Sequence, residues 1–86
     1  MKTDLLIGGQ WRAGTGGERI DVVDPSTGEV IETVAAGVAA DATTAVDAAA
    51  AAQPAWAATA PRVRAEILRN CWQTLMEHTD ELADLI

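Results

Sequence analysis

The sequence predicts a mixed fold in which two β-hairpins are followed by two to three α-helices. Three observations predict it. Short runs of β-branched and apolar residues, separated by turn residues, fill positions 1–36. An alanine-rich run with helical spacing follows at 39–53, and an amphipathic stripe occupies 61–78. Residues 79–86 begin a further helix, so a strand-forming part precedes a helix-forming part.

The first hairpin is predicted around Gly8 and Gly9. The runs Leu5-Leu6-Ile7 and Gln10-Trp11-Arg12 flank this pair, and glycine readily takes the positive φ angles that a two-residue hairpin turn requires. The segment from Ala13 to Glu18 is rich in glycine, so we expect it to form a flexible connection.

The second hairpin is predicted to turn on Asp24-Pro25-Ser26-Thr27-Gly28-Glu29. The runs 19–23 and 30–35 on either side are rich in β-branched residues, which favour strands. Pro25 sets φ at the first central position, the Asp24 carboxylate can accept from backbone N–H groups two or three residues on, and Gly28 can be left-handed. These features predict strands that continue in register beyond the turn.

The first predicted helix, 39–53, is nearly all alanine on more than one side. Asp41 stands at its start, as a cap or in the first turn, where a negative charge is favourable. Because small side chains let a neighbouring backbone approach closely, we expect this helix to pack against several elements. Pro54 is expected to end or kink the helix near Gln53, which would place Trp56 in the connection.

The second predicted helix, 61–78, is the most clearly amphipathic segment. Pro61 suits its first turn, where a missing N–H costs nothing, with Thr59 or Ala60 as the cap. The apolar stripe consists of Val63, Ile67, Leu68, Cys71, Trp72, Leu75 and Met76.

The end of the chain reads as the start of a third helix, 79–86. Thr79 is expected to cap it, with Asp80 and Glu81 in its first turn. Leu85 and Ile86 would ordinarily lie inside a helix, so we expect the chain to be the front of a larger protein.

Composition argues against several functional classes. The net charge of −7 disfavours binding to nucleic acid or to an anionic membrane, because both need clustered positive charge. No secretory signal or membrane-spanning run is recognisable, so a cytoplasmic protein is expected. The single cysteine, Cys71, excludes an intramolecular disulfide, and no Cys/His cluster has metal-ligand spacing.

Cys71 and His78 are the one thiol and the one imidazole, and a nucleophile and its base would use such a pair. Seven residues along one helix separate them by about 10 Å, which is too far for a hydrogen bond. A buried Cys71 and a surface His78 are the preferred interpretation. No catalytic, cofactor-binding or metal-binding residue is predicted.

Other polar groups have structural interpretations as well. The segment Gly14-Thr15-Gly16-Gly17 suggests a phosphate loop, but such loops lie between a strand and a helix, and here a strand-like segment follows. Four carboxylates could form an acidic site, but they are better explained as a solvated helix face and as favourable charge at a helix N-terminus: Glu77, Asp80, Glu81 and Asp84. Three arginines on different sides of the helix fit salt bridges with Glu66 or with missing parts of the protein better than an anion site: Arg62, Arg64 and Arg69. Tryptophans that fit packing anchors are Trp11, Trp56 and Trp72.

Taken in order, these segments resemble the N-terminal part of the aldehyde dehydrogenase superfamily. Its members open with a strand similar to Leu6-Ile7-Gly8-Gly9-Gln10-Trp11 and continue with an Asn/Asp-Pro-x-Thr-Gly-Glu hairpin, here 24–29. The motifs that follow are Ala-Val-x-x-Ala-Ala at 45–50, Trp56, Arg-Ala-x-Ile-Leu-Arg at 64–69 and Asp80-Glu81-Leu82-Ala83. The resemblance covers essentially all 86 residues, and the second and third helices are most similar to the succinate-semialdehyde dehydrogenase branch.

The resemblance implies a parent enzyme of α/β fold that oxidises an aldehyde, with succinate semialdehyde as the candidate, to a carboxylate with NAD or NADP. In the family the catalytic and cofactor-binding residues lie downstream of this segment, and Cys71 does not match the catalytic motif. The 86 residues are therefore expected to be structural and inactive. Their partner would be the remainder of the parent chain. The parent itself would bind the aldehyde substrate and form a homo-oligomer.

Two alternatives remain open. A small acidic helical interaction module would bind a partner through the same apolar stripe, and a native stop codon after Ile86 with stable monomeric behaviour would favour it. A complete small enzyme would use Cys71 and His78, and unchanged activity on Cys71→Ala would remove it. In the preferred interpretation the stripe is buried in the parent, and the isolated chain is partly unfolded or self-associating.

Overall fold

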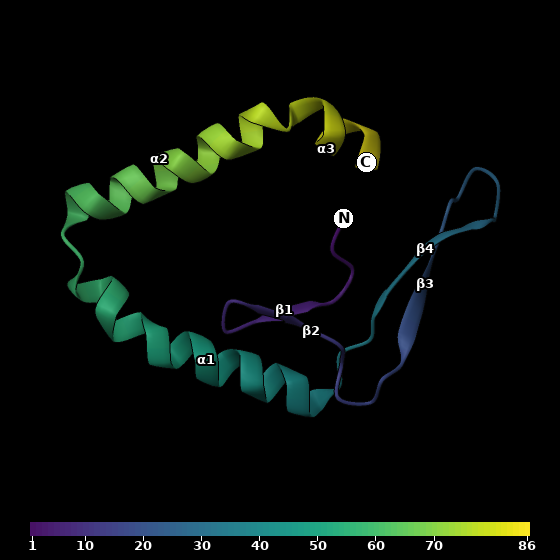
Figure 1. Cartoon of the computed structure of the whole chain (residues 1–86), viewed down its shortest axis with the longest axis horizontal. Coiled ribbons are helices and arrows are strands. Elements are labelled where there is room, and N and C mark those ends of the chain that lie inside the picture. The colour runs from purple at the N-terminus through teal and green to yellow at the C-terminus, as the bar shows by residue number, and fades with distance from the viewer. The chain divides into compact units, whose positions relative to one another are not determined.

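The computed structural model describes all 86 residues, and they fall into two compact units, residues 1–52 and 53–86. The strands are β1 (Leu5–Ile7), β2 (Gln10–Arg12), β3 (Arg19–Val23) and β4 (Val30–Ala35), and the helices are α1 (Ala39–Ala58), α2 (Pro61–Glu77) and α3 (Thr79–Leu85) (Figure 1). The strands form two separate two-stranded antiparallel sheets, β1–β2 and β3–β4. The predicted order of two hairpins followed by helices is confirmed.

The β1–β2 hairpin turns on two glycines, as expected. Gly8 and Gly9 have φ angles of +59° and +78°, and Leu5 pairs with Arg12 while Ile7 pairs with Gln10. A Cβ atom added to Gly8 would lie 3.8 Å from the Cβ of Ala48 in α1. The backbone of the turn therefore approaches the alanine side chains of α1 closely.

The β3–β4 hairpin has the turn chemistry that its sequence predicts. Asp24 Oδ1 accepts from the N–H of Ser26 at 2.8 Å and from its hydroxyl at 2.6 Å. The Gly28 N–H donates to the Asp24 carbonyl at 2.7 Å, with Gly28 at φ +75°. The register shifts between Val22 and Val23, so the ladder contains an irregularity beside the turn.

Helix α1 does not end at Pro54, so the predicted boundary of 39–53 is wrong. The helix continues to Ala58 with Pro54 inside it, and Trp56 lies on the helix rather than in a connection. Proline removes one N–H donor and its ring crowds the preceding turn, but its fixed φ lies close to the helical value, so a helix can continue through it. Thr59 closes the end, with its hydroxyl donating to the Ala55 carbonyl at 2.8 Å.

The junctions that bound α2 differ from each other. Ala60 is the N-cap of α2 and Pro61 stands in its first turn, as expected. Thr79 was expected to cap α3, but His78 occupies the cap position. The Thr79 hydroxyl donates instead to the Met76 carbonyl at 2.6 Å, one of the carbonyls in the last turn of α2.

Few residues are buried within the chain. Three residues are buried, Gly14, Ala35 and Asp41, and all belong to the first unit. Ala35 is 8% exposed and Asp41 is 3% exposed. No helix in the structure combines the length and the apolar character that a membrane span needs. The large side chains of the α2 stripe are between 41% and 62% exposed.

Candidate functional site

One buried carboxylate joins the end of the first hairpin to the start of α1. The Asp41 carboxylate accepts from the Thr15 N–H, with oxygen distances of 3.0 and 3.2 Å, and also from the Thr15 hydroxyl. It accepts from the Val38 N–H at 2.9 Å, and the Arg12 guanidinium lies 3.8 Å away. Donors from three segments of the chain therefore converge on one side chain.

Asp41 also begins the helix on which it lies. It stands in the first turn of α1, and its side chain reaches back to the N–H of Val38, the residue before the helix. The Val38 carbonyl in turn accepts from the N–H groups of Asp41 and Ala42 at 2.9 and 3.2 Å. This reciprocal arrangement resembles a capping box, and the negative charge is favourable at the positive end of the helix dipole.

The surroundings of Asp41 favour its charged form. The hydroxyl of Thr15, followed by the N–H groups of Val38 and Thr15, holds the pKa of Asp41 below its ordinary value, and Arg12 contributes in the same direction. Burial acts in the opposite direction but is outweighed. A carboxylate whose lone pairs are engaged in this way is poorly suited to accept a proton from a substrate, so this group is structural.

The glycine-containing loop before β3 is a hydrogen-bonded turn. The Gly17 N–H donates to the Gly14 carbonyl at 2.9 Å, and a Cβ atom on Gly14 would lie 2.0 Å from the carbonyl oxygen of Ala36. The Thr15 N–H, which a phosphate loop would present to its ligand, already donates to Asp41. The anion that this loop binds is therefore the Asp41 carboxylate of the same chain.

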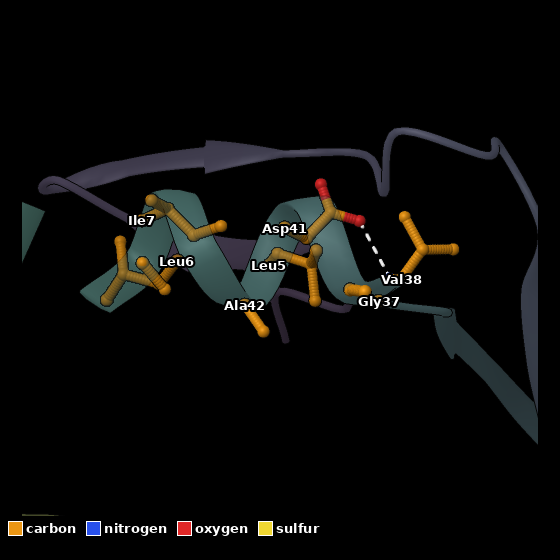
Figure 2. A pocket seen from close by; sticks show the side chains of 9 residues that line it. Leu5, Leu6, Ile7, Gly37, Val38, Asp41 and Ala42 are labelled. Atoms are coloured by element: carbon orange, nitrogen blue, oxygen red, sulfur yellow. Dashed lines mark hydrogen bonds between the residues drawn. The ribbon is translucent and has the colours of Figure 1, made fainter. Parts of the chain in front are cut away.

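An open apolar hollow of about 460 Å³ lies between β1 and the start of α1. Figure 2 shows the side chains that line it, with Leu5, Leu6 and Ile7 from β1 facing the residues around the first turn of α1. Asp41 is the only titratable group in the lining, and one of its oxygens is bonded to Val38 (Figure 2). The hollow can receive apolar groups but offers no free nucleophile or base.

Cys71 and His78 are not joined in the structure. Cys71 is exposed within these 86 residues, and its burial against the remainder of a parent chain stays a prediction. His78 Nδ1 lies 3.0 Å from Glu81 Oε2. The imidazole is thus bonded to the first turn of α3, and nothing pairs it with the thiol.

The charged residues of the helices form local pairs on the surface. Arg62 lies 3.5 Å from Glu66, one turn away, and the Gln73 amide donates to Glu77 at 3.3 Å. Neither Arg64 nor Arg69 forms a salt bridge. The expected pairing with Glu66 is confirmed for Arg62, and pairing of Arg64 and Arg69 with other parts of a parent chain stays a prediction.

Two polar contacts were not anticipated from the sequence. Thr15 and Asp41 were each assigned a different role, and no local spacing connects them. Arg19 in β3 donates to the hydroxyl and carbonyl of Thr33, at 2.9 and 2.8 Å, and to Asp4 and Thr3 near the N-terminus at 3.1 and 2.6 Å. The only feature of the sequence that could have indicated the Arg19 contacts is the position of an arginine at the start of a β-branched run.

Comparison with solved structures identifies the kind of fold. The protein PnpE, solved in complex with nicotinamide adenine dinucleotide, superimposes with a TM-score of 0.94 at 39% identity, over 99% of this chain and 18% of that one. At this identity the two hairpins and three helices correspond to the same elements of an α/β enzyme.

Curated relatives and the family model agree with that assignment. The chain is 43% identical to succinate-semialdehyde dehydrogenase [NADP(+)] GabD of Escherichia coli and 39% identical to glutarate-semialdehyde dehydrogenase of Pseudomonas putida, in each case over all of this chain and 18% of the relative. The model of the aldehyde dehydrogenase family matches residues 11–86. The chain belongs to the aldehyde dehydrogenase family, and it spans less than a fifth of the length of these relatives.

Proposed function

We propose that this chain is the N-terminal part of a longer NAD(P)-dependent aldehyde dehydrogenase, in which it is a structural segment. The observation that carries the proposal is the 43% identity to a succinate-semialdehyde dehydrogenase over the whole of the chain. The reaction is the oxidation of an aldehyde to a carboxylate, with succinate semialdehyde as the first candidate substrate. Glutarate semialdehyde, the substrate in the name of another relative, has the same pairing of an aldehyde with a distant carboxylate.

The 86 residues do not fit the nicotinamide cofactor by themselves. A dinucleotide needs unpaired backbone N–H groups at a glycine-rich turn for its phosphates, and the turn at Gly14 directs the Thr15 N–H to Asp41. The cofactor of the parent enzyme, NAD or NADP, is therefore assigned to residues outside this chain. The same holds for the nucleophile, because Cys71 is exposed on α2 and has no neighbouring base.

The role of the segment is to pack on the rest of the parent chain. The α2 stripe carries six large apolar side chains that are at least 41% exposed, and burial of such surface contributes about 25 cal/mol per Å². In the parent, this face is covered by the remainder of the chain. The proposed parent is a cytoplasmic homo-oligomer. The net charge of −7 on this segment disfavours a nucleic-acid or anionic-membrane partner.

The test is an assay of the longer protein encoded by the continuous reading frame. Purified enzyme is supplied with succinate semialdehyde or glutarate semialdehyde and with NAD⁺ or NADP⁺, and formation of reduced nicotinamide is followed by absorbance. We expect turnover that Cys71→Ala leaves unchanged. Absence of turnover with every aldehyde and both cofactors, in a folded protein, would contradict the proposal.

A second candidate function is a small acidic interaction module. The exposed stripe on α2 favours it, because an unpartnered apolar helix face is typical of helix-in-groove recognition. The two candidates differ in the reading frame: a native stop codon directly after Ile86 would support the module, and a frame that continues through a catalytic domain would support the enzyme.

A further inference from the structure

The segment before β1 lies against the outer edge of β4. The Ala35 N–H, at the end of β4, donates to the Thr3 carbonyl at 2.8 Å, and the Arg19 guanidinium reaches Thr3 and Asp4 from β3. We propose that Thr3 and Asp4 form a strap that closes this edge to pairing with another strand, and that Arg19 is the latch that holds the strap. All of these contacts lie inside the first unit, and the proposal does not rest on the proposed function.

The hydrogen bonding of the β3–β4 ladder shows which groups of β4 face away from β3. The Ala36 N–H donates to the Glu18 carbonyl at 2.9 Å. Because pairs with and without backbone hydrogen bonds alternate along an antiparallel ladder, the next pair, Arg19 with Ala35, exchanges none. The pair two positions on, which contains Thr33, is of the same kind. The N–H and C=O groups of Thr33 and Ala35 therefore point outward, along the edge that a further strand would use.

Three of these outward groups already have partners. The Thr33 carbonyl accepts from Arg19 Nη2 at 2.8 Å, and the Thr33 N–H donates to the Glu32 carboxylate at 2.8 Å. The Ala35 N–H is taken by the Thr3 carbonyl. A row of unpaired groups at a sheet edge is a template for the addition of a strand. Two charged side chains and the strap thus occupy the positions that an added strand would need.

Arg19 suits the role of the latch because its guanidinium is a planar fork with several donors. Its Nε donates to the Thr33 hydroxyl at 2.9 Å, which fixes the side chain on β4. Its other nitrogens donate to Asp4 Oδ1 at 3.1 Å and to the Thr3 hydroxyl at 2.6 Å. Loss of Arg19 therefore releases both residues of the strap, whereas the β3–β4 ladder keeps its own backbone hydrogen bonds.

The first experiment compares two neighbouring amides of β4 by residue-resolved hydrogen exchange in the whole protein that the reading frame encodes. The Ala35 amide faces the strap, whereas the Val34 amide faces β3 and serves as the internal control. Arg19→Met removes the latch but keeps a long side chain. We expect exchange at Ala35 to become at least about fivefold faster, with less than about a twofold change at Val34. Equal acceleration of both amides, or no change at Ala35, would overturn the proposal.

A second variant releases the strap without altering β3. Thr3→Val with Asp4→Ala removes the two side-chain acceptors and leaves Arg19 bonded to Thr33. We expect exchange at Ala35 to rise as it does in Arg19→Met, and the triple variant to add little, because the substitutions break the same contacts.

Glu29→Ala, which removes an exposed acid in the turn of the same hairpin, is the matched control for this variant. It should leave exchange at Ala35 within about twofold of the original rate. A double variant that behaves like this control would show that the strap is not held by the latch.

Closure of the edge is tested with a strand as the probe. The probe is a fluorescent peptide with the sequence of residues 29–36, since an extended β-branched segment can add to an open sheet edge. We expect the peptide to bind Arg19→Met and the Thr3–Asp4 double variant at least about tenfold more tightly than the original protein, whose edge is occupied. Equal affinity for all three proteins, or binding to none of them, would contradict closure of the edge by the strap.

Discussion

The N–H and the hydroxyl of Thr15 both donate to the carboxylate of Asp41, which lies 26 positions later in the chain. This contact connects the turn after the first hairpin to the first turn of α1. Asp41 is at the same time 3% exposed and bonded to the residue before the helix. One side chain therefore sets both where α1 begins and where the loop lies, and the first prediction tests it.

Replacing Asp41 by asparagine is expected to release this loop. Asparagine keeps the size of the side chain, but it replaces one acceptor oxygen by a donor group, so the donors from Thr15 and Val38 can no longer all be satisfied. Hydrogen exchange of the Thr15 amide should become several-fold faster, and the chain should unfold at a lower denaturant concentration. The matched control is Asp47→Asn, an exposed acid further along α1. Equal effects of the two substitutions would show that Asp41 has no special role.

The stability of the first unit is expected to fall in acid. Hydrogen bonds from Thr15 and Val38 lower the pKa of Asp41 below 3.8, and those from Ser26 lower the pKa of Asp24. The unfolded chain therefore binds these protons more readily than the folded chain. The stabilisation from the two carboxylates is present above pH 3.8, the pKa of the free side chain. It is lost as the pH falls through the lower pKa values of the folded state. Denaturant unfolding measured from about pH 7 to about pH 2 should show this slope, and Asp41→Asn should reduce it. A slope that the variant leaves intact would assign the acid sensitivity to other groups.

Gly14→Ala is expected to be strongly destabilising. The added Cβ would lie 2.0 Å from the Ala36 carbonyl oxygen, and a backbone atom cannot move aside as the end of a side chain can. The cost should be about 3 kcal/mol, at the upper end for overpacking. Gly16→Ala is the control, because its Cβ would meet only Val38 Cγ1 at 3.6 Å, and it should change the free energy of unfolding by less than about 0.5 kcal/mol. Chemical denaturation of both variants measures the difference, and similar values would contradict the close approach at Gly14.

Pro54→Ala is expected to strengthen α1. Alanine restores an N–H donor and removes the clash of the ring with the preceding turn, which is worth up to about 3 kcal/mol in a helix interior. Helical content by circular dichroism and the free energy of unfolding should both rise. Pro61→Ala, in the first turn of α2, should change the stability by less than about 0.5 kcal/mol. A loss of stability in Pro54→Ala would mean that the proline is required where it stands.

Sequence patterns predicted the elements with local causes. The glycine pair at positions 8 and 9 and the turn at 24–29 have their geometry encoded in neighbouring residues, and both hairpins formed as expected. The amphipathic period of α2 and the proline in its first turn are also local signals. The end of α1 does not follow from Pro54, because the alanines on both sides of the proline favour the helix strongly enough to offset the hydrogen bond that it removes.

The candidate site could not be predicted in the same way. Asp41 was recognised as a helix-start residue, which requires only its own neighbours, but its contacts with Thr15 and Arg12 join distant segments. The same is true of Arg19, which joins Thr33 to the residues before β1. No periodicity or spacing records such contacts.

The sequence by itself determined the two hairpin turns, the order of strands and helices, and the resemblance to the aldehyde dehydrogenases, because each of these depends on residues adjacent in the chain or on their order. Only the tertiary structure decided that Asp41 fills the turn at Gly14 and that Arg19 joins Thr33 to Asp4. Hydrogen bonding across 26 residues and burial both depend on which distant segments meet, and that is a property of the folded chain.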